Sequence, residues 1–447
     1  MKSENAVPHG TYYIETYGCQ MNEHDSEKMA AMLEELGLTE ASSPEGAEVV
    51  VINTCSIREK AEHKLYSALG KLKPLKVKNP GMVTVVAGCV AQQEKNKLLK
   101  KVCHLDAVLG THCIAELPSV LDRVNKARER IALTDFHSNM DSLHFPAPCK
   151  GRSRVCSYVT IMQGCSNFCS YCVVPFTRGP EQSRSAEEII EETSALVAKG
   201  VREVTLLGQN VNAYGNDLPS GNSFARLLTE LDGIQGLQRI RFTTSHPRDF
   251  DANLVSVMAN LKSVCEHIHL PLQSGSDKIL RAMRRGYTLT DYLNKISLLR
   301  EAIPSVAVTA DMIVGFPGET EEDLSRTLAA LEQIRFDQIF SFKFSVRPGT
   351  AARNLPDQVP EEMKAERLSR VHALQDKITE DCHLRAEGTV EEVLIEGFKP
   401  KTGQPFGRTR TNKIVNLEPM NDLREGDLVK VRISRGLKHS LVGKKVK

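Results

Sequence analysis

Residues 155–172, VCSYVTIMQGCSNFCSYC, join a predicted strand to a loop that carries three cysteines. Cys165, Cys169 and Cys172 follow one another with C-x3-C-x2-C spacing. Cysteine thiolates are the usual protein ligands of iron–sulfur clusters. Three thiolates leave one iron of a four-iron cluster without a protein ligand, and S-adenosylmethionine (SAM) binds such an iron through its amino and carboxylate groups. We therefore predict a catalytic [4Fe-4S] cluster at this loop, where one-electron cleavage of SAM yields a 5′-deoxyadenosyl radical.

A structural zinc loop is the alternative interpretation of the same cysteines. Structural zinc sites take four protein ligands, and no fourth Cys or His lies close to the loop in sequence. Cys156 is on the preceding predicted strand, and we expect its side chain to point away from the loop. The iron–sulfur interpretation is therefore favoured.

Strand–helix alternation continues after the loop and predicts a partial (β/α)6 barrel. The predicted strands are 155–162, 202–208, 238–245, 266–271, 306–314 and 337–345, and the predicted helices are 185–199, 223–232, 251–260, 276–301 and 320–334. The chemistry of such barrels lies at the C-terminal ends of the strands. The residues at these ends that we expect to bind SAM are Gly208, Gln209, Asn210, Ser245, His246, Gln273 and Ser274.

Each of these residues has a turn or a helix cap as its alternative role. His246 is the strongest acid–base candidate, but hydrogen abstraction by a radical needs no base, so a polar contact is expected. Arg178 and Arg184 follow the cluster loop. They are candidates for contact with the SAM carboxylate or with RNA phosphate, and surface ion pairs are their alternative role.

Three more cysteines share one context in the N-terminal region. Predicted strands at 11–17, 47–53, 82–87 and 106–110 alternate with helical patterns, which indicates a parallel α/β domain. Because parallel strands end at one edge of their sheet, the cysteines that follow the first three strands are expected to meet there. Three buried core cysteines are the alternative. We predict a second cluster with the ligands Cys19, Cys55 and Cys89.

The C-terminal region is basic and has short β-rich runs. Residues 385–447 carry fourteen Lys/Arg against eight Asp/Glu, a net charge of +6, whereas the whole chain has a net charge of +2. The runs VEEVLIEGF, KIVNLEP and DLVKVRISR predict a small β-barrel. The charge indicates a polyanion partner or, alternatively, a solvated surface. The cations that we expect to bind RNA are Arg408, Arg410, Lys413, Arg432, Arg435 and Lys438.

Length and composition are consistent with this organisation. A chain of 447 residues suggests about two to four domains. We place an α/β domain at 1–130, a linker at 131–153, the partial barrel at 154–384 and the small barrel at 385–447. No apolar run is long enough to span a membrane. The chain begins with no apolar signal core. We therefore expect a cytoplasmic protein, in which clustered cysteines indicate metal binding rather than disulfides.

With both cysteine triads in view, the chain resembles the methylthiotransferase family of radical SAM enzymes. The likeness covers nearly the whole chain. The motifs that carry it are YGCQMNEHDSE, NTCSIREKAEHKLYSALG, GCSNFCSYCVVPFTRGPEQSRS, LLGQNVNAYG, PLQSGSDKILRAMRRGY and DMIVGFPGETEEDL. The GCQMN and TCSIREKAE forms are most similar to the subgroup that modifies isopentenylated tRNA, and the basic tail is similar to that family's RNA-binding TRAM barrel.

The resemblance implies methylthiolation at C2 of N6-isopentenyladenosine at position 37 of tRNA. It implies two [4Fe-4S] clusters, sulfur delivery at Cys19, Cys55 and Cys89, and a second SAM as methyl donor. The expected partners are a tRNA anticodon stem-loop and an electron donor such as a flavodoxin or ferredoxin, without a membrane. A monomer is expected. The alternatives are methylthiolation of threonylcarbamoyl-adenosine or of a ribosomal protein and, in another class, a non-catalytic RNA-binding iron–sulfur redox sensor.

Overall fold

The computed structural model describes residues 10–56, 59–136, 155–219, 221–420 and 422–446. They form two compact units. The first comprises the described residues up to 136, together with Gln163–Ser166 and Val173–Gln182. The second comprises residues 155–162, Asn167–Cys172 and the described residues from 183 onward. Most of the predicted linker, residues 137–153, lies outside the described residues. No helix in the described parts of the chain is both long and apolar enough to cross a membrane.

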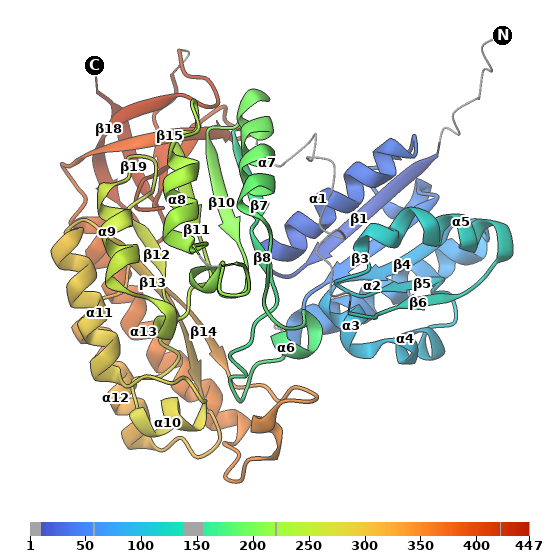
Figure 1. The fold of residues 1–447 in the computed structure, drawn as a ribbon, viewed down its shortest axis with the longest axis horizontal. Coiled ribbons are helices and arrows are strands. Elements are labelled where there is room, and N and C mark those ends of the chain that lie inside the picture. Colours follow the sequence, from blue (N-terminus) through green and yellow to red (C-terminus); the bar gives the residue numbers. More distant parts are fainter. Residues whose placement is uncertain (1–9, 57–58, 137–154, 220, 421, 447) are drawn as a thin grey trace. The chain divides into compact units, whose positions relative to one another are not determined.

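The first unit is built on a sheet of parallel strands (Figure 1), as the sequence predicts. The strand order is β2-β1-β3-β4-β5-β6, with β1 Thr11–Tyr17, β2 Thr39–Glu40, β3 Val49–Thr54, β4 Val83–Ala87, β5 Ala107–Leu109 and β6 Ile131–Leu133. One apolar core joins the sheet to α1 (Gln20–Glu35) and α5 (Leu117–Ala127). A second core joins it to α2 (Glu59–Lys78), α3 (Cys89–Glu94) and α4 (Asn96–Lys101). The sheet is therefore covered on both faces.

Local backbone features explain where this unit departs from the prediction. The helical pattern after β4 divides into α3 and α4 because Lys95 adopts a left-handed conformation, with φ of 52°. The strand β6 occupies residues that the sequence assigned to the linker at 131–153, since Ile131 packs into the core of the sheet. The short strand β2 and the helix α5 were not predicted either.

The second unit contains six parallel strands with helices between them, which confirms the predicted partial (β/α)6 barrel. The strands are β7 Cys156–Thr160, β10 Glu203–Leu207, β11 Arg239–Phe242, β12 His267–His269, β13 Ala307–Val314 and β14 Gln338–Lys343. They pair as β11-β10-β7 and β12-β13-β14. A parallel bridge between Ile240 and Val264 connects the two groups. The helices are α7 Ala186–Ala198, α8 Phe224–Asp232, α9 Ala252–Asn260, α10 Asp277–Ala282, α11 Leu289–Ala302 and α12 Glu321–Ile334.

One predicted helix of the barrel is divided in two. The sequence pattern suggested a single helix at 276–301, but residues 283–288 form a turn between α10 and α11. Arg284 and Gly286 have positive φ there, and Thr288 begins α11 with a capping box to Asp291. This turn carries Arg285, which the next subsection places at the cluster loop.

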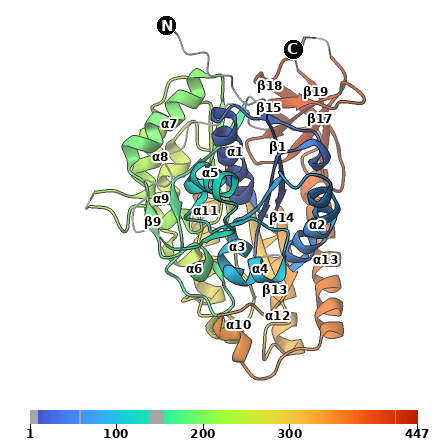
Figure 2. The same cartoon turned by 90° about the vertical axis from the view of Figure 1, so that its right-hand side faces the viewer.

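The long helix α13 (Glu361–Leu384) leads to a closed five-stranded barrel at the C-terminus (Figures 1 and 2). The strand order is β15-β16-β17-β19-β18, with β15 Val390–Phe398, β16 Pro405–Thr409, β17 Ile414–Leu417, β18 Leu428–Gly436 and β19 Leu441–Lys445. Eight apolar residues with exposures of at most 6% fill it. The small β-barrel predicted from the basic tail is therefore confirmed.

Candidate iron–sulfur and SAM sites

The loop with Cys165, Cys169 and Cys172 follows the short strand β8 (Met162–Gln163). Its backbone is tightly constrained. Gly164 has φ of 82°, and a Cβ there would lie 1.8 Å from the carbonyl oxygen of Pro180. Phe168 also has positive φ, at 47°, which is uncommon for a bulky residue. The Cys172 N–H donates to the Cys169 carbonyl at 3.0 Å, closing a turn between these two cysteines.

Arg285 lies against the cluster loop and was not predicted as a site residue. Its Nη1 is 3.4 Å from the sulfur of Cys169 and 3.4 Å from the Tyr171 hydroxyl. Its Nε donates to the Tyr287 hydroxyl and its Nη2 donates to the Pro271 carbonyl, both at 3.0 Å. A buried guanidinium beside a thiolate ligand offsets part of the negative charge of a cluster. The only sequence signal for it is the RRGY string after α10, which does not show where a long side chain points.

The strand ends that follow this loop carry buried polar atoms that lack hydrogen-bond partners. They are Oγ of Ser245, Nε2 of His246 and Oε1 of Gln273. Gln273 also has φ of 72°, a strained conformation for a side chain of this size. Buried polar atoms are normally paired, so unpaired ones at a strand end indicate a missing polar ligand. Three of the predicted SAM-binding residues therefore fit a SAM site.

The hydrogen-bonding state of His246 can be assigned from its neighbours. Its Nδ1 accepts from the Arg248 N–H at 3.1 Å, so the ring proton is on Nε2. Burial, aided by the nearby cations Arg285, Arg248 and Lys295, lowers the pKa of His246 to about 2. The ring is therefore neutral and offers one N–H donor, which suits a polar contact and not acid catalysis.

The other predicted SAM-binding residues have partners or packing roles. A Cβ on Gly208 would lie 2.6 Å from Cγ of Met162, so the strand end passes close to β8. Asn210 donates to Asp249 at 2.7 Å, and Ser274 accepts from the N–H of Ser276 at 3.2 Å. Gln209 is half-buried after β10. Asn210 and Ser274 thus have turn-stabilising contacts of the kind that the sequence left open.

The second cysteine triad is brought together at one edge of the N-terminal sheet. Cys19, Cys55 and Cys89 follow β1, β3 and β4, which are neighbours in the sheet. The Cys55 thiol hydrogen bonds to both other sulfurs. These hydrogen bonds, against burial and with help from the Arg178 guanidinium, lower the pKa of Cys89 to about 6 and that of Cys19 to about 7. The same hydrogen bonds and burial raise the pKa of Cys55. Two of the three sulfurs therefore favour the thiolate form that binds metal, and Cys55 would release its proton when a cluster binds.

Two glycines keep the space beside these sulfurs open. A Cβ on Gly18 would lie 2.5 Å from Cβ of Cys55, and one on Gly88 would lie 2.3 Å from Oδ1 of Asn53. Both glycines have positive φ. Oδ1 of Asn22 lies 3.3 Å from the Cys19 sulfur, and the Asn22 side chain donates to Asn53 at 3.0 Å. A fixed polar network therefore holds the cysteine-bearing turns.

Three family models match the chain. Residues 11–110 match the Uncharacterized protein family UPF0004, residues 159–331 the Radical SAM superfamily and residues 384–446 the TRAM domain. A Carboxydothermus hydrogenoformans protein named tRNA-2-methylthio-N(6)-dimethylallyladenosine synthase is 48% identical over 97% of this chain and 98% of its own. A Geobacter metallireducens protein of that name is 50% identical over 96% and 97%. The chain belongs to the tRNA-2-methylthio-N(6)-dimethylallyladenosine synthase family.

Solved structures show the same fold. TsrM from Kitasatospora setae, a radical SAM methyltransferase, matches with a TM-score of 0.57 at 14% identity, over 77% of each chain. OxsB, a cobalamin-dependent SAM radical enzyme, matches with a TM-score of 0.52 at 11% identity, over 83% of this chain and 56% of its own. Membership of the synthase family and the Radical SAM match assign SAM and a [4Fe-4S] cluster to this chain.

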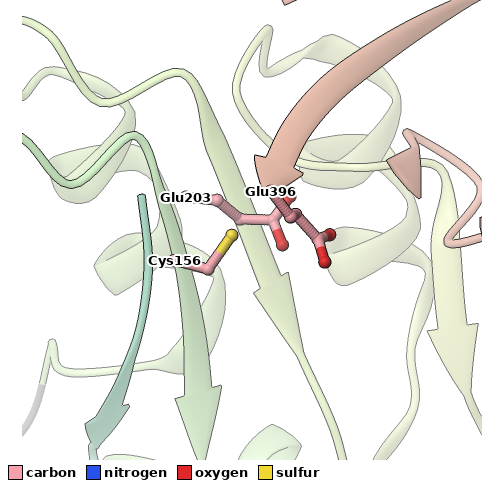
Figure 3. A group of neighbouring side chains, drawn as sticks. All are labelled: Cys156, Glu203 and Glu396. Carbon is pink, nitrogen blue, oxygen red and sulfur yellow. The ribbon is translucent and has the colours of Figure 1, made fainter. Parts of the chain in front are cut away.

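A third group of ligand-type side chains in this family member consists of Cys156 on β7, Glu203 on β10 and Glu396 on β15, which Figure 3 shows gathered together. Their sulfur and oxygen atoms lie within 4.8 Å of one another. Arg241 binds Glu203 at 2.9 Å and Arg408 binds Glu396 at 3.2 Å. Burial and the two carboxylates raise the pKa of Cys156. A protonated thiol and arginine-paired carboxylates disfavour a cation there.

The predicted RNA-binding residues of this synthase-family chain divide into two groups. Arg408, Arg410 and Lys413 form ion pairs with Glu396, Glu266 and Asp337 at 3.2, 2.7 and 2.7 Å. Two of these acids, Glu266 and Asp337, belong to the partial barrel, so Arg410 and Lys413 attach the TRAM barrel to it. The second group is exposed and consists of Arg432, Arg435 and Lys438. Lys438 forms an ion pair with Asp376 at 2.8 Å, but both side chains of that pair are about half exposed.

Proposed function

We propose that this chain methylthiolates C2 of N6-isopentenyladenosine at position 37 of tRNA, forming 2-methylthio-N6-isopentenyladenosine. The observation that carries the proposal is the thiol triad at the ends of β1, β3 and β4, in addition to the SAM loop. A radical SAM enzyme with a second set of cluster ligands has a place for the sulfur that is inserted. The relatives' name supplies the modified base.

The proposal gives each part of the SAM site a task. A bound [4Fe-4S] cluster with SAM supplies the electron that cleaves the sulfonium and releases a hydrogen-abstracting radical. Cys165, Cys169 and Cys172 hold the cluster, and Arg285 offsets charge at Cys169. Ser245, His246 and Gln273 hydrogen bond to SAM with the buried atoms that have no protein partner. Gly208, Gln209, Asn210 and Ser274 shape the strand ends around it.

A second [4Fe-4S] cluster held by Cys19, Cys55 and Cys89 is the proposed sulfur site. The lowered pKa values of Cys19 and Cys89 favour the thiolate form that such a cluster requires. A second SAM supplies the methyl group. An electron donor such as a flavodoxin or ferredoxin reduces the clusters. We place the protein in the cytoplasm as a monomer. Its proposed domains are an N-terminal domain that runs through β6 and domains at 154–384 and 385–447.

The tRNA anticodon stem-loop is the proposed macromolecular partner, and the outer face of β18 and β19 is its proposed docking surface on the TRAM barrel. Lys430, Arg432 and Lys444 are exposed there, and Arg432 pairs in register with Lys444. Arg435 and Lys438 extend this face. Lys444 and Lys438 pair with Glu418 and Asp376, but these acids are about half exposed, so the cations remain accessible to phosphates. Bases of an RNA loop are unstacked, which suits chemistry on one adenosine.

Anaerobic reconstitution tests this function. About eight irons per chain and reductive cleavage of SAM are expected. The Cys165→Ala variant loses SAM cleavage, whereas Cys55→Ala keeps cleavage and loses sulfur insertion. Four irons in the wild-type protein contradict the second cluster. Two clusters without SAM cleavage indicate a redox sensor instead.

A further inference from the structure

Arg178 packs with the N-terminal α/β domain and not with the partial barrel. It follows the SAM-cluster loop in the chain, yet it belongs to the first unit. Its carbonyl accepts from Nε2 of His112 at 2.9 Å, and the carbonyl of Thr177 accepts from Oγ1 of Thr111 at 2.6 Å. The backbone at Arg178 is thereby fixed to the turn that follows β5.

The guanidinium of Arg178 is buried among the residues of the second cysteine triad. The short helix α6 (Val174–Thr177) packs against α3, which begins at Cys89. Nη2 of Arg178 donates to Oδ2 of Asp25 at 2.7 Å, and the two side chains are 3% and 5% exposed. Asp25 is on α1, the helix that follows Cys19. The positive charge of Arg178 acts on both Cys19 and Cys89.

The ion pair with Asp25 engages Nη2 and leaves Nη1 of Arg178 for an acceptor among the cysteine sulfurs. Nη1 of Arg178 is buried and meets no acceptor at full hydrogen-bond geometry, although the side chain approaches the Cys89 sulfur closely enough to stabilise its thiolate by a hydrogen bond. A buried donor without an acceptor is unfavourable, so its presence indicates an acceptor that binds later. Besides Asp25, the groups that interact with this guanidinium are Cys89 and Cys19. A cluster at these cysteines brings inorganic sulfide and any sulfur anion on its open iron. Asp25 fixes the direction of the guanidinium and so orients the free donor.

We propose that Arg178, held by Asp25, is a positioning residue that hydrogen bonds to anionic sulfur at the second cluster. This rests on the proposed function, because it requires the cluster at Cys19, Cys55 and Cys89. Hydrogen bonds and positive charge at cluster sulfurs stabilise the more negative, reduced state. Arg178 therefore raises the reduction potential of this cluster, and Asp25 opposes it by its negative charge.

The test is a redox titration followed by electron paramagnetic resonance. The background is the full chain with Cys165→Ala, Cys169→Ala and Cys172→Ala, so that only the second cluster contributes. In this background Arg178→Gln is expected to lower the midpoint so that the reduced fraction at a fixed potential falls at least tenfold, or 59 mV for one electron. Asp25→Asn keeps the guanidinium and is expected to raise the midpoint.

A matched control separates this role from a structural one. Arg130 belongs to the same unit, and its guanidinium donates to the carbonyls of Leu99, Val102 and Leu105. Arg130→Gln is expected to leave the midpoint unchanged. If Arg178→Gln loses its iron, the midpoint potential of Asp25→Asn tests the proposal instead. A midpoint in Asp25→Asn that is lowered or unchanged overturns the proposal.

The outcomes distinguish this inference from the function on which it rests. A background protein that binds no iron overturns the second cluster and the role of Arg178 together. Four irons with the same midpoint in Arg178→Gln overturn the role of Arg178 alone. Shifts of opposite sign in Arg178→Gln and Asp25→Asn support it, because loss of packing does not produce opposite signs.

Discussion

Arg241→Met is expected to weaken the attachment of the TRAM barrel to the partial barrel. Nη1 and Nη2 of Arg241 donate to the carbonyls of Arg410 and Thr409, both at 2.8 Å, and Nε lies 2.9 Å from Glu203. Arg241 and Glu203 are 5% and 4% exposed. Removal of Arg241 therefore leaves a buried carboxylate and two buried carbonyls without this partner.

The expected loss of unfolding free energy depends on the ion pair between Arg239 and Glu203, which remains in the variant. Removing one partner of a buried ion pair costs about 3–5 kcal/mol. Arg239 stays 3.8 Å from Glu203 and compensates part of the charge. We therefore expect about 3 kcal/mol, roughly a hundredfold in the unfolding equilibrium. In the double variant Arg241→Met/Glu203→Gln the loss is expected to be smaller, because no uncompensated carboxylate remains.

Urea unfolding followed by far-ultraviolet circular dichroism measures this loss. The chain has no Trp, so a tryptophan fluorescence signal does not exist. Arg226→Met is the control, since Arg226 forms an exposed i,i+4 pair with Glu230 at 2.8 Å that contributes about 0.3–0.5 kcal/mol. A cost below about 1 kcal/mol for Arg241→Met, or a double variant that loses the full sum of the single effects, refutes the reasoning.

Three further predictions concern the sites. Gly88→Ala is expected to reduce the iron content by about half and to spare SAM cleavage, because the new Cβ would meet Asn53 and the backbone φ is positive. Iron analysis of the reconstituted variant checks this. Retention of eight irons contradicts it. The double variant Lys430→Glu/Lys444→Glu is expected to weaken tRNA binding and to make the affinity depend less on salt concentration. Filter binding at several salt concentrations checks this. An unchanged affinity excludes β18 and β19 as the docking face. His246 is neutral in the folded state with a pKa of about 2. In the unfolded chain a His takes up a proton near pH 6.5. The contribution of neutral His246 to stability is therefore present above that pH and falls as the pH is lowered. His246→Asn is expected to reduce this loss of stability between pH 7 and pH 5, measured by urea unfolding, and an identical pH dependence of the two proteins contradicts the assignment.

The strands of both α/β parts were predictable from the sequence. Strands such as β3, β4 and β13 are nearly continuous apolar runs, and β11 and β14 alternate polar and apolar residues. The positions of Cys19, Cys55 and Cys89 at one sheet edge followed from strand parallelism alone. The division of the predicted helix 276–301 at Arg284 and Gly286 could not be predicted, because the helical spacing of apolar residues continues across the turn. Strand β6 was missed because three residues carry too little pattern to separate a strand from a linker.

The arginines show where sequence reasoning ends. Arg178 was expected near SAM or phosphate, but its guanidinium pairs with Asp25, which is 153 positions away in the chain. Arg410 was expected at RNA, but it binds Glu266. A long side chain reaches partners that depend on tertiary packing, and no local spacing reports that. Cysteines are more predictable because a short side chain stays at its turn.

The central claim is that this chain inserts sulfur into an isopentenylated adenosine of tRNA. The most direct measurement is nucleoside mass analysis of tRNA from cells that lack the protein. The account predicts that 2-methylthio-N6-isopentenyladenosine disappears, that N6-isopentenyladenosine accumulates, and that the wild-type chain but not Cys55→Ala restores the product. Persistence of that nucleoside together with loss of a different methylthio product contradicts it.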